Sequence, residues 1–362
     1  MAVGTDAPPY IVFWNPYTRT SPYTLPFPNT HAGMVKYLIC TDNNMLISLS
    51  NDTYVKNWNY ADASNIWNIK MPYEQTAMEL LNNATLVVGS INGSLSECDI
   101  STGGCQPPVK IHGNQINDFE ILENGDLVTG PSAELIRVWN PGSYVGWLIE
   151  INIITQPKCL KRLPNGYLAC GLTNGVLKIY NMSNQSLVLE FKAHSAAITS
   201  LELLKNGDLA SASRDKTIKI WNSISFNLTG QLNSHTKTVN TLKVLSDCLL
   251  ASGSDDYLIK VWNTTSMTIL NEVNIGQAVK ALELLRNDTF FNSTPMSIAK
   301  TGIEFYFSQL SISEQKQLLN SKYDLSGCIV NCTYHGFCKF DSVSDSFTCG
   351  CSEFYTGKFK LN

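Results

Sequence analysis

The sequence repeats itself with a period of about 41 residues, and this repeat limits the fold more than any other feature. Its clearest form is LASASRDKTIKIWN at 209–222. Copies of it stand at 2–15, 46–59, 86–99, 127–140, 168–181 and 250–263. Each unit contains short alternating apolar stretches separated by polar turns, a pattern typical of three or four strands and not of a helix. The repeat therefore predicts a series of small sheets, each packed on its neighbours.

Every unit closes on an aromatic residue or on a substitute for one. The closing residues are Trp14, Trp58, Cys98, Trp139, Tyr180, Trp221 and Trp262. In four units a histidine also stands 27 residues before the aromatic residue. These histidines are His31, His112, His194 and His235. The fixed spacing indicates that each histidine has the same place in its own sheet.

These motifs resemble the WD40 repeat family, in which a histidine, a strand Ser or Thr, a turn Asp and the Trp form a hydrogen-bonded chain inside each blade. Three units match in full. They are His31, Ser48, Asp52 and Trp58; His194, Ser211, Asp215 and Trp221; and His235, Ser252, Asp256 and Trp262. A Ser, a His and an Asp also make up a catalytic triad, but a nucleophile site occurs once whereas these sets recur in every matching blade. We therefore expect a structural role for them.

Three units depart from this pattern. The unit that ends at Trp139 keeps His112 but has Ala133 at the Asp position. The units that end at Cys98 and Tyr180 lack the histidine, and they have Asn92 and Asn174 at the Asp position. We expect packing of apolar side chains to hold these two blades together.

The resemblance implies an all-β, seven-bladed WD40-type β-propeller over residues 1–307, with its strongest repeats at about 112–140, 194–222 and 235–263. In this reading the ring closes within one shared blade. The segment 10–14 is expected to supply an outer strand, and 278–302 the inner strands. Residues 308–326 are expected to form a linker. A helix is predicted at 311–321, because Ser311 and Glu314 have the spacing of a capping box.

The last residues hold a dense group of cysteines. Five of the 11 cysteines in the chain are Cys328, Cys332, Cys338, Cys349 and Cys351. Their spacing resembles an EGF-like domain, covering 327–362, and the resemblance implies the disulfides Cys328–Cys338 and Cys332–Cys349. The sixth cysteine of that family would stand near Lys360, so Cys351 is expected to lack its partner. Calcium binding is not expected, because Asp324 alone precedes the module, and the spacings fit a structural zinc site poorly.

Further modification sites follow from short motifs. Cys98 and Cys105 bracket a turn-rich segment and are a candidate disulfide. Asn-x-Ser/Thr motifs, the acceptor for N-glycans, number ten, and a disulfide-rich module belongs to an oxidising compartment. The acceptors are Asn51, Asn83, Asn92, Asn181, Asn184, Asn227, Asn263, Asn287, Asn292 and Asn331.

Composition excludes several functional classes. The chain has 362 residues, of which only 15% are charged, with 26 Lys+Arg against 30 Asp+Glu and no basic run. Nucleic-acid binding is therefore not expected, since it needs clustered cations. No apolar stretch is long enough to span a membrane. Nor does the sequence contain a phosphate-binding glycine loop, a metal-ligand motif or a unique nucleophile motif, so no cofactor and no catalysis are expected.

Together these features favour a non-enzymatic protein-interaction platform, extracellular or luminal, that binds a protein partner through loops around the central channel near the four histidines. No signal peptide stands at the start, where the sequence begins directly on a predicted blade strand. We therefore expect it to be part of a longer chain. Two alternatives stay open. One is an intracellular WD40 scaffold with a degenerate cysteine-rich tail, and the other is a propeller lectin or hydrolase.

Overall fold

A computed structural model of the chain forms two compact units, Met1–Arg286 and Asn287–Asn362, which are considered separately. It describes residues 1–6, 10–14, 16, 23–24, 31–41, 45–60, 64–81, 84–132, 135–144, 146–285, 336–341 and 346–351, with the backbone only for 23–24, 336–341 and 346–351. The predicted boundary at 307, the linker 308–326 and the helix 311–321 lie outside the described residues.

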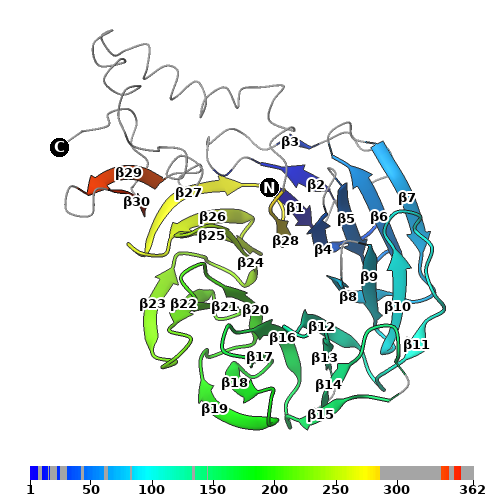
Figure 1. Ribbon diagram of the computed structural model, residues 1–362. Coiled ribbons are helices and arrows are strands. Elements are labelled where there is room, and N and C mark those ends of the chain that lie inside the picture. The colour runs from blue at the N-terminus through cyan, green and yellow to red at the C-terminus, as the bar shows by residue number, and fades with distance from the viewer. Residues whose placement is uncertain are drawn as a thin grey trace. The chain divides into compact units, whose positions relative to one another are not determined.

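The first unit contains seven four-stranded antiparallel sheets, the blades, arranged around a central channel (Figure 1). Blades 1 to 3 consist, from the channel outward, of β4 (Val35–Cys40), β5 (Met45–Ser50), β6 (Tyr54–Asn59) and β7 (Ser64–Lys70); β8 (Gln75–Leu80), β9 (Thr85–Ser90), β10 (Ser94–Asp99) and β11 (Val109–Lys110); and β12 (Ile116–Ile121), β13 (Leu127–Pro131), β14 (Leu135–Trp139) and β15 (Ile149–Asn152). The expected all-β, seven-bladed propeller is thereby confirmed.

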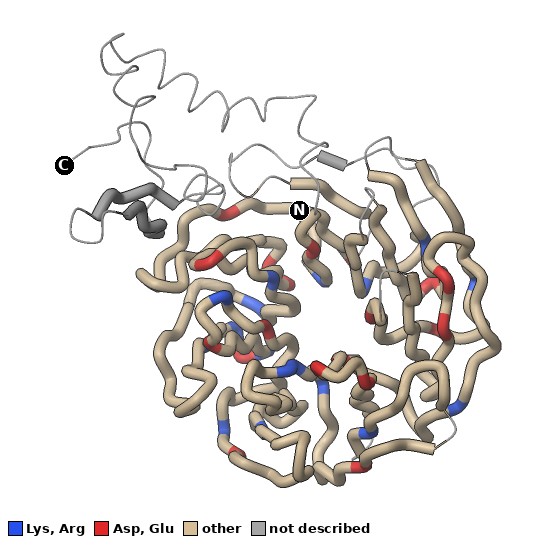
Figure 2. The backbone as a smooth tube through the Cα atoms, in the orientation of Figure 1, with Lys and Arg blue, Asp and Glu red and all other residues tan. Residues whose placement is uncertain are grey.

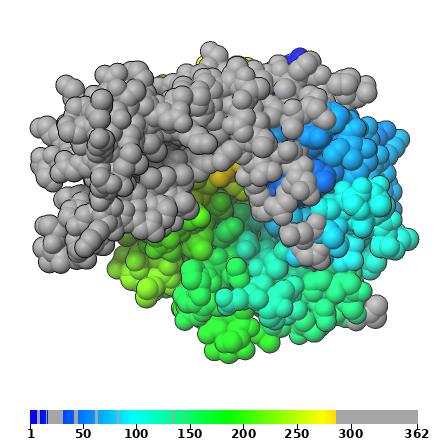
Figure 3. Space-filling model, turned by 45° about the horizontal axis from the view of Figure 1, so that its top comes forward, coloured from blue at the N-terminus to red at the C-terminus, as the bar shows by residue number. Residues whose placement is uncertain are grey.

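Blades 4 to 6 repeat this order. They consist of β16 (Pro157–Arg162), β17 (Tyr167–Leu172), β18 (Val176–Asn181) and β19 (Ser186–Lys192); β20 (Ile198–Leu203), β21 (Leu209–Ser213), β22 (Thr217–Trp221) and β23 (Leu228–Asn233); and β24 (Val239–Ser246), β25 (Leu249–Ser254), β26 (Leu258–Asn263) and β27 (Thr268–Asn274). The blades lie side by side around the ring, as the succession from blue through cyan to green shows in Figure 3.

Blade 7 joins the two ends of the propeller and corrects our expectation. Its inner strand is β28 (Val279–Glu283), and the N-terminal segment supplies the other three, β1 (Ala2–Thr5), β2 (Ile11–Phe13) and β3 (Tyr23–Thr24). The sequence predicts one outer strand from 10–14 and the inner strands from 278–302, of which the structure describes 278–285. The assignment was wrong because Ala2–Thr5 is too short to show alternation, and its place is fixed by pairing, with Val3 opposite both Val12 and Leu282.

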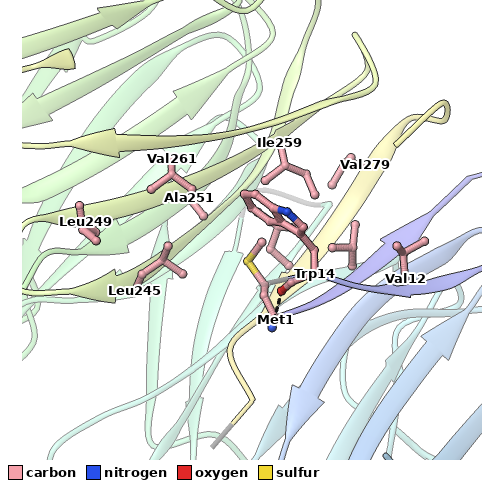
Figure 4. Close-up of a cluster of buried hydrophobic side chains, with 11 residues drawn as sticks. Met1, Val12, Trp14, Leu245, Leu249, Ala251, Ile259, Val261 and Val279 are labelled. Atoms are coloured by element: carbon pink, nitrogen blue, oxygen red, sulfur yellow. Dashed lines mark hydrogen bonds between the residues drawn. The ribbon is translucent and has the colours of Figure 1, made fainter. Parts of the chain in front are cut away.

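A hydrophobic cluster between blades 6 and 7 seals this closure (Figure 4). Trp14 and Met1 are almost fully buried against Ile259, Val261 and Val279. The Met1 ammonium donates a hydrogen bond to the Trp14 carbonyl oxygen at 2.9 Å. Its burial lowers the pKa of this group to about 5. Similar hydrophobic clusters fill the interfaces between consecutive blades from blade 1 to blade 6, so the core lies between the blades.

In the second unit, the structure describes one antiparallel pair of strands, β29 (Gly336–Asp341) and β30 (Ser346–Cys351). In their register the Cα atoms of Cys338 and Cys349 are opposite each other. The side chains of all five C-terminal cysteines lie outside the described residues. In the described part of the whole chain, no helix has the length and apolar character needed to cross a membrane.

Candidate functional site

Blades 1, 5 and 6 each contain the four-residue network expected from the sequence. In blade 5, His194 Nε2 lies 2.8 Å from Ser211 Oγ, and His194 Nδ1 lies 2.9 Å from Asp215 Oδ2. Trp221 Nε1 donates to the same Ser211 Oγ at 2.8 Å. The corresponding contacts in the other two blades are His31–Ser48, His31–Asp52, Trp58–Ser48, His235–Ser252, His235–Asp256 and Trp262–Ser252.

The carboxylate end of each network is ionised. Burial alone would raise the pKa of Asp52, but hydrogen bonds from His31 and from backbone amides lower it to about 2. The pKa of Asp215 is lowered in the same way, against its burial, by Thr217 and His194. An ionised Asp accepts from His Nδ1–H, which leaves Nε2 to accept from the Ser hydroxyl while that hydroxyl accepts from the Trp indole. Every polar side-chain atom that joins the four residues of the network then has a hydrogen-bond partner.

This arrangement supports the structural reading of the histidines. Ser48, Ser211 and Ser252 are 0% exposed, so none of these hydroxyls can meet a substrate. Each Asp also accepts from the backbone amide that follows the histidine, for example from Ser195 N at 3.0 Å. Each network thus ties the loop before an inner strand to the turn between the second and third strands. We call the propeller face made of these loops and turns the histidine face.

Blade 3 has a shortened version of the network. His112 Nε2 lies 2.6 Å from Thr129 Oγ1, and Trp139 Nε1 donates to that oxygen at 3.0 Å. Ala133, at the Asp position, lies outside the described residues. Burial, with the nearby charge of Arg137, lowers the pKa of His112 to about 3, so this histidine is neutral.

Blades 2, 4 and 7 have apolar side chains at the same three positions. Where blade 5 has His194, Ser211 and Trp221, blade 4 has Ile153, Cys170 and Tyr180, all at most 4% exposed. Blade 2 has Met71, Val88 and Cys98, and blade 7 has Ile275, Val3 and Trp14. In blades 2 and 4 the loss of the histidine is therefore matched by the loss of its Ser and Trp partners, whereas blade 7 keeps the Trp.

Cys98, which stands where other blades have an aromatic residue, forms a disulfide with Cys105. The loop that it closes packs on Trp67 of blade 1. Trp67 Nε1 donates to the Ile100 carbonyl oxygen at 2.9 Å, and a Cβ on Gly103 would come within 3.0 Å of the Trp67 ring. The disulfide thus holds blade 2 to its neighbour. Three described cysteines, Cys40, Cys159 and Cys170, are buried and form no disulfide.

One recurrent set of residues was missed by the sequence analysis. A Lys or Arg two residues before the closing aromatic donates to a carbonyl oxygen of the histidine loop. Arg137 bonds the Ile111 oxygen at 2.7 Å, Lys178 the Ile153 oxygen at 3.1 Å and Lys219 the Ala193 oxygen at 2.6 Å. The basic residue recurs in the sequence motifs IRVW, LKIY and IKIW, and this recurrence could have identified the set.

The inner strands line the channel with polar side chains. Thr76, Asn117, Thr199 and Asn240, each second in its inner strand, donate to the carbonyl oxygen of the first residue in the next inner strand. The fifth residue of each inner strand lies farther along the channel from the histidine face. These residues are Ile39, Glu79, Glu120, Lys161, Glu202, Lys243 and Glu283, one from each blade. Ion pairs join neighbours among them, Lys161 to Glu120 and Glu202, and Lys243 to Glu283. Figure 2 shows both charge signs around the central opening.

At the face opposite the histidines, blades 3 to 5 enclose a cavity of about 460 Å³. Its walls are Glu120, Glu123, Lys161, Arg162, Leu163, Pro164, Glu202 and Leu203. Among the described residues, no three His, Cys, Asp or Glu side chains are arranged to hold a metal ion.

Comparisons with known proteins agree with this geometry. The WDR54 family matches residues 102–227, and the family described as WD domain, G-beta repeat matches residues 226–263. The first unit is a WD40 propeller. The crystal structure of the computationally designed Ika8 protein has the same fold, with a TM-score of 0.60 and 20% sequence identity over 77% of this chain and 88% of the designed one. The search of curated proteins gives no match.

WD40 propellers generally serve as non-enzymatic scaffolds that bind protein partners. On this WD40 propeller the histidine face exposes several large apolar side chains. They are Tyr10, Tyr73, Ile91, Ile154 and Tyr257, with 39 to 73% of each side chain exposed. Apolar and aromatic side chains of this kind are the usual anchors of protein interfaces.

The described glycan acceptors of the WD40 propeller differ in exposure. Asn51, Asn184 and Asn227 are exposed, and Asn92 and Asn181 are partly buried. Asn263 is 4% exposed, and its side-chain oxygen accepts from the amides of Thr265 and Ser266. Asn83, Asn287, Asn292 and Asn331 lie outside the described residues.

Proposed function

We propose that the protein is a non-enzymatic, extracellular or luminal interaction platform whose WD40 propeller binds a protein partner on the histidine face. The observation that carries the proposal is the combination of fixed loops with exposed apolar residues. Hydrogen-bond networks hold the loops of blades 1, 3, 5 and 6. Between these held loops, Tyr73 and Ile91 of blade 2 and Ile154 of blade 4 project into solvent. Anchors held by a rigid scaffold lose little entropy on binding.

The C-terminal region is part of the same proposal. We infer that residues 327–362 form an EGF-like module with the disulfides Cys328–Cys338 and Cys332–Cys349. The cysteine spacing supports it, and so does the antiparallel pairing of β29 with β30. Such a module forms in an oxidising compartment, which the propeller would share. The disulfide Cys98–Cys105 agrees with that compartment.

Glycosylation follows from the same location. In this proposal Asn51, Asn184 and Asn227 carry glycans, whereas Asn263 does not, because its side chain is buried and hydrogen-bonded. Asn184 lies in the β18–β19 turn and Asn227 in the β22–β23 loop, both on the face opposite the histidines. Glycans on Asn184 and Asn227 leave the apolar residues of the histidine face uncovered, whereas a glycan on Asn51, in the β5–β6 turn, would stand on the histidine face.

The location is tested by mass spectrometry of the chain purified from the cells that make it naturally. We expect glycans on Asn184 and Asn227, an unmodified Asn263 and disulfides among the C-terminal cysteines. If all these cysteines are reduced and every acceptor is bare, the protein is an intracellular scaffold instead.

The binding face is tested separately by proximity labelling in the same cells. Tyr73→Ala together with Ile91→Ser should abolish the partners that the wild-type chain labels. The matched control is Ile224→Ser, which removes an 83% exposed apolar side chain from the opposite face. Equal loss from both variants would place the binding surface elsewhere.

A further inference from the structure

The channel mouth on the histidine face contains a cation without a counter-ion. Lys36, Lys158 and Lys280 occupy the second position of β4, β16 and β28, where the other four blades have Thr or Asn. Lys36 pairs with Glu74 at 2.6 Å, and Lys280 pairs with Asp255 at 2.6 Å. Lys158 has no ion-pair partner among the described residues.

The missing partner has a clear origin in the repeat. Glu74, which pairs with Lys36 of blade 1, directly precedes β8, the inner strand of the next blade. For Lys158 of blade 4 the next inner strand is β20, and the residue directly before it is Ala197. Asp255, which pairs with Lys280 of blade 7, directly follows β25, the second strand of blade 6. For Lys158 the equivalent strand is β13 of blade 3, and the residue directly after it is Ser132. Both acidic positions around Lys158 are therefore neutral.

The surroundings of Lys158 are positive as well. Arg214 is exposed in the β21–β22 turn of the next blade, at the position that Asp255 occupies in blade 6. Burial lowers the pKa of Lys158, and the charges of Arg214 and Lys36 lower it further. Asp118 and Cys159 act in the opposite direction, but burial raises the pKa of both, that of Asp118 to about 7. Because neither is fully ionised near neutral pH, Lys158 and Arg214 stay largely uncompensated.

An apolar residue stands beside this cationic pair. Ile154, four residues before Lys158, is 73% exposed. Its φ is 64°, and the Thr155 amide donates to the Ile153 carbonyl oxygen at 2.7 Å across it. A β-branched residue is strained in this conformation, and strain of this kind gathers at functional sites. The tight turn pushes the Ile154 side chain into solvent at the edge of the same blade.

We propose that the histidine face at blades 4 and 5 binds an acidic segment of the protein partner, with a carboxylate held by Lys158 and Arg214 and an adjacent apolar side chain packed on Ile154. This inference rests on the proposed interaction function and names the chemistry of its partner. Charge complementarity selects the segment, because two uncompensated cations favour a carboxylate and disfavour a basic chain. The carboxylate would also serve as the counter-ion that Lys158 lacks, since Ala197 and Ser132 occupy the two positions that are acidic near the other lysines.

Selection of displayed random peptides on the full-length chain tests this proposal. The enriched sequences should contain Asp or Glu next to an apolar residue. A synthetic copy of the most enriched peptide should bind at least about tenfold more weakly to Lys158→Met, which keeps the aliphatic stem but removes the charge. The matched control is Lys205→Met, an exposed lysine in the β20–β21 turn of the opposite face, which should bind as the wild type does.

Two further variants separate binding from folding. Ile154→Gly relieves the strained φ, so it should raise the unfolding midpoint while it weakens peptide binding. Replacing the peptide carboxylate by its amide should weaken binding to the wild type but not to Lys158→Met. If a phosphoserine in the same place binds more tightly than the carboxylate, the assignment to an acidic residue is wrong.

The outcomes distinguish this inference from the proposed function. Enriched peptides that are neutral or basic, and that Lys158→Met binds normally while Tyr73→Ala does not, would overturn the acidic segment and leave the interaction platform intact. If no sequence is enriched, or if no substitution on the histidine face changes binding, both proposals fail.

Discussion

Blades 5 and 4 are neighbours with the same strand order, yet opposite chemistry holds them together. In blade 5 a chain of hydrogen bonds runs from Trp221 through Ser211 and His194 to Asp215. In blade 4 the equivalent positions are filled by Tyr180, Cys170 and Ile153, which only pack. The comparison shows that in blade 4 the histidine and its Ser and Trp partners are replaced together, because one of them left alone would be a buried polar group without a partner. Blade 3 keeps a shortened network of His112, Thr129 and Trp139.

The largest expected effect on stability comes from removing one polar residue from the hydrogen-bond network of blade 5. Ser211→Val removes the acceptor of the Trp221 indole and the donor to His194, so two buried polar atoms lose their partner. We expect a loss of about 3 kcal/mol in the free energy of unfolding, measured by urea denaturation. The reciprocal Cys170→Ser in blade 4 should cost about 1 kcal/mol, since it adds one hydroxyl to an apolar site. Equal costs would remove the distinction between the two kinds of blade.

The next effect concerns blade 2, where a disulfide stands in place of the network. Replacing Cys98 and Cys105 by Ser opens a short loop, and loop closure of this length is worth about 2.5 kcal/mol. A reducing agent should lower the unfolding midpoint of the wild type by a similar amount. Because Cys248 is also disulfide-bonded, the reducing agent should lower the midpoint of the double variant by less than that of the wild type, and equal drops would assign the effect to another disulfide.

A smaller effect follows from the pKa of Asp52, which is about 2 in blade 1 against an ordinary value of 3.8. The folded state therefore binds this proton less readily than the unfolded state does. The stability it contributes is complete above about pH 4 and is lost as the pH falls toward 2. After allowance for solvent screening we expect about 1 kcal/mol. Unfolding midpoints of the wild type and Asp52→Asn should converge at low pH, and parallel curves would contradict the network in blade 1.

The smallest effect is shared by both kinds of blade. Lys219→Met in blade 5 and Lys178→Met in blade 4 each remove a hydrogen bond to a loop carbonyl oxygen. Each should cost about 0.5 kcal/mol in thermal unfolding, because Met keeps the aliphatic stem and only the hydrogen bond is lost. A clearly larger cost in blade 5 would mean that the lysine acts through His194.

The sequence was sufficient to predict the blades, because a period near 41 with fixed His and Trp spacing leaves few other folds. The split of blade 7 was not predictable in detail, since Ala2–Thr5 has no alternation of its own and depends on pairing with β28. Lys158 shows a second limit. The sequence shows that residue 158 is a lysine, but its lack of a counter-ion depends on Ser132 of blade 3 and on Ala197 and Arg214 of blade 5.

The shared blade has a consequence for synthesis on the ribosome. Among the propeller strands, β1 and β2 are made before all the others, but their inner neighbour β28 is made about 270 residues later. At roughly 5–20 residues per second the N-terminal strands would wait about 13–50 s with an open edge. An open edge is a template for pairing with other chains, so this interval is the period of greatest aggregation risk. A chaperone or a neighbouring blade could cover the first 24 residues during that time. The extent of this protection would determine what fraction of chains folds into a closed propeller.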